Sequence, residues 1–165
     1  MAERKRRVKQ KSLQYFFLND KIHKVLKASR SKDELVAWCY PDKKRVLYSY
    51  SQVKKNMEKA YSILEVSEIL NKHRVTIQDY IIEGKVLTPH IIYPISRQDN
   101  YTWFRYMFSH KNIYDIHEHI LESGHSKNVP SKTELQAILK NNIILYTKTD
   151  SGFVPVWKAD WWLVE

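Results

Sequence analysis

Two short amphipathic helices, predicted in the middle of the chain, constrain the fold more than any other part of the sequence. Leu64, Val66, Ile69 and Leu70 supply most of the i, i+3, i+4 pattern of one apolar helix face. A tight turn at residues 71–72 separates this helix from a second helical pattern. The two helices are therefore expected to pack directly on each other.

The second helix has its own apolar face and a clear stop signal. Ile77, Tyr80 and Ile81 repeat at i+3 and i+4, so they are predicted to pack on the first helix. Gly84 suits the left-handed position at which a helix ends. The apolar run over residues 86–95, interrupted by two prolines, then predicts an extended wing.

The other face of the second helix is polar. Two helices joined by a tight turn form the layout that places a helix across a DNA groove. Arg74, Thr76 and Gln78 point away from the apolar face, so we expect them to contact DNA bases. Three residues near the helix ends are predicted to hold phosphates: Lys72, His73 and Lys85.

In the order of these elements, the chain resembles the winged helix-turn-helix of excisionase and MerR-type DNA-binding proteins. The matching parts are residues 65–70, the turn to Lys72, residues 73–82 and the Glu-Gly-Lys step at residues 83–85. The resemblance covers about residues 62–122, because the family continues from its wing into another helix. It implies sequence-selective binding of duplex DNA, with the second helix in the major groove and the wing against the backbone or minor groove.

Two residues depart from the family pattern. His73 stands where a small hydroxyl residue often caps the second helix, and Asp79 stands where a cation often faces phosphate. A carboxylate at this place accepts a hydrogen bond from a cytosine amino group but repels a phosphate. Asp79 could thus contact a base or could disfavour DNA binding.

The net charge of +10 is distributed unevenly along the chain. Residues 1–11 hold six basic side chains against one acidic, and residues 12–60 hold eleven against five. Residues 61–125 hold six against eight, and residues 126–165 hold five against four. A basic surface is the electrostatic footprint of phosphate binding. Affinity for DNA is therefore expected to come from the first sixty residues.

The first eleven residues are predicted to form a flexible basic arm, because no apolar pattern there could bury the charges. If all six cations met phosphates, counterion release would give a log-log salt slope of roughly 5. The alternative is a solvated tail that aids solubility. No apolar segment follows these basic residues closely enough to form a secretory signal peptide. The predicted phosphate contacts are Arg4, Lys5, Arg6, Arg7, Lys9 and Lys11.

A small module is expected over the following residues up to 60. Residues 19–28 are predicted to form a short helix, and residues 34–40 and 45–50 a β-hairpin. Residues 51–59 then lead as a helix or helical turn into the central motif. The rings of Trp38 and Tyr48 are expected in the core, with base stacking or partner contact as the alternative. The hairpin tip supplies further candidate phosphate contacts: Lys43, Lys44 and Arg45.

Five aromatic residues fall within residues 101–108, with Arg97 before them and Arg105 among them. Interleaved rings and arginines can indicate a site for single-stranded nucleic acid. The favoured interpretation is that these rings lie in the wing strands and pack over the helices. Arg97 and Arg105 are further candidates for contact with the DNA backbone. The helix that follows, through residue 122, is expected to begin at Ser109 and to pack or dimerise through one apolar face formed by Ile113, Ile116, Ile120 and Leu121.

The last forty residues are predicted to form a helix and a β-hairpin. A capping box at residues 131–134 opens the helix through residue 141, and residues 143–147 and 153–157 form the strands. Three tryptophans near the end either complete the core or dock on a partner: Trp157, Trp161 and Trp162.

Together these patterns predict an α+β protein in four parts: the arm (1–11), a helix and β-hairpin module (12–60), a winged helix-turn-helix (61–125) and a C-terminal helix with a β-hairpin (126–165). A single cysteine, Cys39, excludes an internal disulfide and suits the cytoplasm. No apolar run approaches the roughly twenty residues of a membrane span.

No catalytic signature is present in the sequence. A glycine-rich phosphate loop, a nucleophile elbow and a carboxylate set with metal-ligand spacing are all missing, so we expect no enzyme activity, cofactor or metal. The leading hypothesis is a non-enzymatic binder of double-stranded DNA, bacterial or phage-encoded, acting as a transcription regulator or an excisionase-like architectural factor. The alternative is an interaction subunit of a phage packaging or transcription complex, touching nucleic acid mainly through its basic front. A homodimer or a phage or host protein partner fits either hypothesis.

Overall fold

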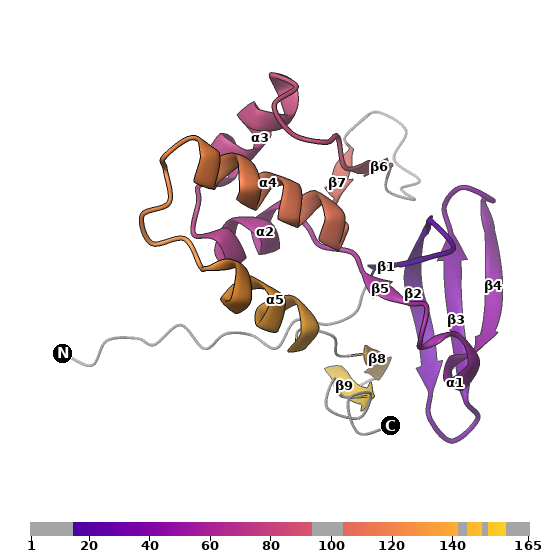
Figure 1. Ribbon diagram of the computed structural model, residues 1–165. Helices are drawn as coiled ribbons and strands as arrows, with labels where there is room; N and C mark the ends of the chain where they lie inside the picture. The colour runs from indigo at the N-terminus through magenta and orange to yellow at the C-terminus, as the bar shows by residue number, and fades with distance from the viewer. Residues whose placement is uncertain (1–14, 94–103, 142–144, 150–151, 158–165) are drawn as a thin grey trace.

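An antiparallel sheet and a group of helices lie side by side, with a short pair of strands between them, as the computed structural model shows (Figure 1). The structure describes residues 15–93, 104–141, 145–149 and 152–157. The mixed α+β class predicted from the sequence is confirmed.

The five-stranded sheet has the strand order β4-β3-β2-β1-β5, and every pairing in it is antiparallel. A short helix, α1, follows β4 and leads toward β5. The bounds are β1 Tyr15–Leu18, β2 Lys21–Ser29, β3 Glu34–Cys39, β4 Lys44–Ser49, α1 Tyr50–Val53 and β5 Glu58–Lys59. The helix or helical turn predicted over residues 51–59 is thus present as α1 and the turn over residues 54–56, and the chain is a strand at the end of this segment, in β5.

The helix predicted over residues 19–28 is wrong, because this segment forms the turn and second strand of a hairpin. Asn19 and Asp20 adopt left-handed backbone angles, φ 52° and φ 61°. Two consecutive residues of this kind make the turn that matches the twist of a two-stranded hairpin. The helix-like apolar spacing arises at a register shift between Val25 and Lys27, which interrupts the strand's alternation.

The β3–β4 hairpin is confirmed, but its core face is the one with smaller side chains. Leu35, Ala37 and Cys39 are buried, whereas Trp38 lies on the opposite face and is half-exposed. The expectation that Trp38 is a core residue is therefore wrong. Tyr48 is half-buried and packs on the core, as predicted.

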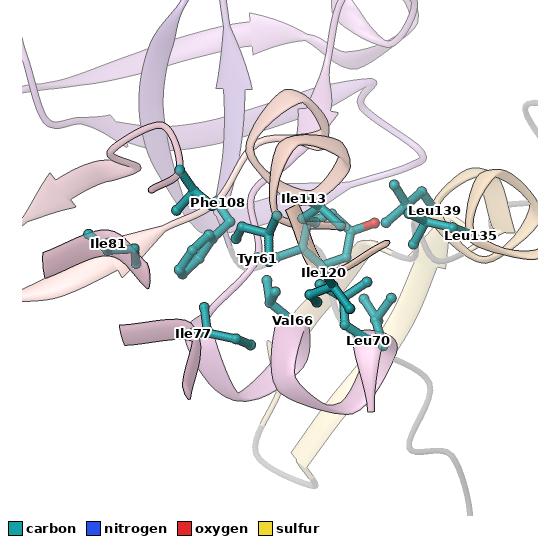
Figure 2. Close-up of a cluster of buried hydrophobic side chains, with 13 residues drawn as sticks. Tyr61, Val66, Leu70, Ile77, Ile81, Phe108, Ile113, Ile120, Leu135 and Leu139 are labelled. Carbon is teal, nitrogen blue, oxygen red and sulfur yellow. The ribbon is translucent and has the colours of Figure 1, made fainter. Parts of the chain in front are cut away.

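The helical part follows β5 and contains the short strands β6 and β7. Its bounds are α2 Ile63–Leu70, α3 Arg74–Ile82, β6 His90–Ile92, β7 Arg105–Met107, α4 His110–Glu122 and α5 Lys132–Asn141. The helices share one core, and Figure 2 shows side chains from α2, α3, α4 and α5 converging around Tyr61 and Phe108. The backbones of Tyr61 and Phe108 also exchange two hydrogen bonds, at 2.9 and 2.8 Å.

Two residues expected on apolar core faces are exposed instead. Leu64 is 54% exposed and Leu121 is 45% exposed. In α2 the buried side chains are Val66, Ile69 and Leu70. Because each residue turns a helix by about 100°, Leu64 lies far around α2 from Val66. The buried stripe is narrower than the sequence pattern suggested.

The β6–β7 pair joins the two halves of the molecule. Ile92 and Met107 are buried against Phe17, Ile22 and Ala60 of the sheet side. The region predicted to form an extended wing thus contains a pair of antiparallel strands, and one face of this pair is packed inside the protein.

A separate two-stranded sheet ends the described chain. Strand β8, Leu145–Thr149, pairs antiparallel with β9, Gly152–Trp157, as predicted. Strand β8 lies next to β2. Trp161 and Trp162 fall outside the described residues.

Candidate nucleic-acid interface

Helix α2 is held in place at both ends by local hydrogen bonds. The Ser62 hydroxyl accepts a bond from the Glu65 backbone N–H, and the Glu65 carboxylate accepts one from the Ser62 N–H, both at 3.2 Å. Asn71 ends the helix in a left-handed conformation, φ 50°. The reciprocal capping box and the left-handed residue fix where the turn begins.

Helix α3 is also capped at both ends. His73 Nδ1 accepts a hydrogen bond from the Val75 N–H at 3.2 Å. The imidazole therefore caps the helix, as a serine or threonine hydroxyl does at many helix starts. After the helix, Gly84 adopts φ 70°, and the N–H of Lys85 bonds to the Tyr80 carbonyl at 2.9 Å. This confirms the predicted left-handed end at Gly84.

The face of α3 that points away from the core contains two of the three predicted base-contact residues. Arg74 and Gln78, one turn apart, are exposed, while Thr76 is half-buried at the edge of this face. Ile77 and Ile81 on the other side are buried in the helical core. No described residue covers the polar side of α3.

Three more residues share the exposed side of α3 and were not predicted to lie in a site. Val75 is 48% exposed, Ile82 is 68% exposed, and Asp79 is also exposed. The seven-residue spacing of Val75 and Ile82 returns to the same helix side and could have revealed this apolar pair. The opposite charges of Arg74 and Asp79 leave this face electrically balanced.

The predicted phosphate contacts near α3 are partly engaged elsewhere. Lys72 Nζ donates to the His125 carbonyl at 2.6 Å, which ties the α2–α3 turn to the loop between α4 and α5. The Asn71 amide donates to the Asn128 carbonyl at 3.1 Å in the same place. Lys85 remains half-exposed but forms an ion pair with Glu83 at 3.1 Å.

The two faces of the β6–β7 pair differ sharply. One face exposes Ile91, which lies opposite Tyr106, next to exposed Phe104. The other face holds Arg105, whose guanidinium carbon lies 5.7 Å from the ring centre of Tyr15 and whose Nη1 lies 3.5 Å from the Tyr15 hydroxyl. Arg105 therefore contacts Tyr15 of the five-stranded sheet.

The tip of the β3–β4 hairpin projects three cations, as predicted. Lys43, Lys44 and Arg45 are all exposed. By contrast, Lys21 donates to the Asp42 carboxylate at 2.8 Å, and this bond holds the pKa of Asp42 below its ordinary value. Arg97 and the arm predicted over residues 1–11 lie outside the described residues.

The described histidines have structural contacts. His117 is buried and its Nε2 donates to the Pro130 carbonyl at 2.7 Å, while the ring of His119 lies edge-on to Tyr80. Within the described part of the chain, no group of three or more His, Cys, Asp or Glu side chains could hold a metal ion. Among the described helices, none has the length and apolarity needed to cross a bilayer.

Comparison of the chain with protein-family models, with curated proteins and with solved structures gives no match. The function has to be inferred from the geometry of the site.

Proposed function

We propose that the protein binds duplex DNA without enzymatic activity, through a winged helix-turn-helix formed by α2, α3, β6 and β7. The role is that of a transcription regulator or an excisionase-like architectural factor. The supporting observation is that α3 is capped at both ends, packed through Ile77 and Ile81, and open to solvent at Arg74 and Gln78. A rigid helix with an uncovered polar side is what a major groove accepts.

The exposed side chains of α3 offer chemistry for each kind of base edge. Arg74 suits the two acceptors of guanine, Gln78 suits adenine, and Asp79 accepts from the amino group of cytosine. Val75 and Ile82 offer apolar contact to thymine methyl groups. Arg74 and Gln78 lie about 6 Å apart along the helix axis, close to the length of two base-pair steps of about 3.4 Å each.

Affinity in this proposal comes mainly from cations outside α3. The exposed side of α3 is electrically balanced, and Lys72 and Lys85 already have protein contacts. The hairpin tip, defined by Lys43, Lys44 and Arg45, provides exposed positive charge on the sheet. Together with the arm, this tip makes the binding strongly dependent on salt.

A selection of bound sites from random duplexes tests this proposal. The wild-type chain is compared with the double variant Arg74→Ala/Gln78→Ala and with the matched double variant Lys132→Ala/Gln136→Ala. The matched pair sits on α5, is also one turn apart and exposed, and removes the same charge.

The wild-type chain and the α5 variant should select the same sequence motif. The α3 variant should lose discrimination by roughly 10- to 100-fold at the contacted base pairs, since each good bidentate contact contributes about 1–3 kcal/mol. An unchanged motif in the α3 variant would overturn the proposal.

A second candidate function is supported by the apolar residues around α3. Val75, Ile82, Leu87, Ile91 and Phe104 are each between 45% and 68% exposed. Exposed apolar groups in such number are typical of a surface that docks protein. The chain would then be an interaction subunit of a phage nucleoprotein machine, and Arg74→Ala/Gln78→Ala would leave DNA site preference unchanged.

A further inference from the structure

One row of side chains crosses the outer face of the five-stranded sheet, far from α3 in the fold. Tyr15 on β1 pairs with Lys24 on β2, Lys24 pairs with Trp38 on β3, and Trp38 pairs with Arg45 on β4. Residues directly opposite each other on antiparallel strands point to the same face. These four residues, which we call the outer row, alternate aromatic ring and cation.

The outer row lies on the face of the sheet opposite its main core. Leu35 and Ala37, on the neighbouring positions of β3, are buried with Tyr50 of α1 on the other face. Lys24 and Arg45 are exposed, and Trp38 is half-exposed between them. An indole that is half-exposed and flanked by cations is not explained by core packing.

The charges of Lys24 and Arg45 in the outer row are not neutralised by the part of the chain that the structure describes. No carboxylate among the described residues pairs with Lys24 or Arg45, whereas Lys21 nearby is paired with Asp42. Glu34 is on the same face of β3 but four residues from Trp38, about 13 Å along the strand. The row therefore presents uncompensated positive charge on both sides of one ring.

The row continues at its β1 end toward the wing. Arg105 of β7 lies over the ring of Tyr15 at 5.7 Å. The next row of the sheet adds another exposed cation, Lys27, which lies opposite Val36, and Val36 in turn lies opposite Leu47, which is 65% exposed. The surface is thus basic and partly apolar.

We propose that the outer row binds single-stranded nucleic acid, with one base stacked on the Trp38 indole and the flanking phosphates on Lys24 and Arg45. Neighbouring strands lie about 4.8 Å apart, so the backbones that bear the two cations are about 10 Å apart, with the ring midway between them. Aromatic rings that stack bases, combined with a basic track for the backbone, are how sequence-tolerant single-strand binders work. This surface is distinct from α3 and does not depend on duplex binding there.

The test measures the affinity of the full chain for a labelled oligothymidylate of about 15 nucleotides, within the site sizes of such surfaces. The variants are Trp38→Leu, Trp38→Phe and the double variant Lys24→Gln/Arg45→Gln. The matched control is Lys132→Gln/Lys140→Gln, which removes the same charge from exposed positions of α5. Circular dichroism melting checks that each variant is folded.

Loss of the indole in Trp38→Leu should weaken binding by roughly 5- to 150-fold, and Trp38→Phe should retain part of it. Lys24→Gln/Arg45→Gln should lower the log-log salt slope by about 1.4, because single strands lose about 0.7 per phosphate contact. The α5 control should change neither the affinity nor the specificity of single-strand binding beyond a small general charge effect.

The inference is overturned if folded Lys24→Gln/Arg45→Gln binds the oligonucleotide no more weakly than the α5 control does. It is also overturned if a glutamate-rich peptide competes as well as the oligonucleotide, because the surface would then recognise acidic protein. If Trp38→Leu fails to fold, the charge variants decide the outcome. Arg74→Ala/Gln78→Ala should keep single-strand binding, so failure of the duplex proposal would leave this one standing.

Discussion

His110 sits at the start of α4 with unusual electrostatics for a single residue. Its Nδ1 lies 3.2 Å from the Glu58 carboxylate, which favours a charged ring. Burial of the ring and the positive charge of Lys59 oppose this, and they lower the pKa of His110 to about 4. The ring is then neutral beside Glu58, and its Nε2 is buried without a hydrogen-bond partner among the described residues.

The depressed pKa of His110 predicts a loss of stability in mild acid. In the unfolded chain a histidine titrates near 6.5, so between pH 6.5 and about 4 the unfolded state holds a proton that the folded state does not. As the pH falls from 6.5 to about 4, the free energy of unfolding should therefore decrease by about 3 kcal/mol at most. Above pH 6.5 the full stability should be present, because the ring is then neutral in both states. Urea titrations at several pH values measure this.

The variant His110→Asn serves as the control for the acid effect, because it keeps a polar side chain beside Glu58 but does not titrate. The difference in free energy of unfolding between the wild-type chain and His110→Asn should change by up to about 3 kcal/mol between pH 6.5 and about pH 4. A difference that is constant with pH would contradict the assigned cause.

His73 makes a separate prediction about the start of α3. Its Nδ1 is the acceptor for the Val75 N–H, so His73→Ala should lower the free energy of unfolding by about 1 kcal/mol. His73→Ser should restore it, because a hydroxyl accepts the same bond. Denaturant titration of both variants decides, and equal stability of the alanine and serine variants would show that the cap contributes nothing.

At the scale of elements, the signals that predicted structure well were local and chemical. Ser109 and Gly84 are predicted correctly as helix ends because capping needs only a few neighbouring residues. The hairpin turn at Asn19 and Asp20 was missed, since both residues had to adopt positive φ, and the same residue types also cap helices.

The candidate site was predicted less completely than the elements. Helical periodicity placed Arg74 and Gln78 on the exposed side of α3. It could not place Trp38 between Lys24 and Arg45, because strand register depends on pairing between distant segments. It also could not show that Lys72 is bound by a carbonyl more than fifty positions away.

The junction between β5 and α2 depends on a buried ion pair. Lys59 is 1% exposed, and its Nζ lies 2.7 Å from Glu65 and 4.8 Å from the ring centre of Tyr61. Glu65→Gln keeps the capping box but removes the negative charge, so we expect a loss of about 3 kcal/mol in the free energy of unfolding. Thermal and urea unfolding measure this.

Two comparisons sharpen the ion-pair prediction. Glu118→Gln on the exposed side of α4 should change stability by less than about 0.5 kcal/mol. The double variant Lys59→Met/Glu65→Gln should recover part of the loss, because the buried charge is then also gone. A double variant that is less stable than Glu65→Gln alone would contradict this account of the junction.

For the whole molecule, the β6–β7 pair makes one body of the sheet and the helices. Ile92 is 3% exposed in the cluster with Phe17 and Ile22, while its neighbour Ile91 points outward and is 45% exposed. Ile92→Ala should cost about 2–5 kcal/mol, and Ile91→Ala should cost far less.

The shared cluster also predicts that the two halves lose stability together. In Ile92→Ala, hydrogen exchange should accelerate in both β1–β2 and α2–α4, since the contact joins them. Acceleration confined to the helices would show that the sheet folds independently. Such coupling would hold the basic sheet and α3 in a fixed relation on one nucleic acid.

The most direct test of the central claim is to map where α3 lies on DNA. A cleavage reagent is attached at Glu83→Cys, the exposed residue that ends α3, with the exposed Glu134→Cys on α5 as the matched site and the buried Cys39 replaced by alanine in both. The α3 reagent should cut the selected duplex at a few adjacent base pairs within the preferred sequence, and the α5 reagent should cut weakly or not at all. Equal, scattered cutting from both positions would contradict the placement of α3 in the groove.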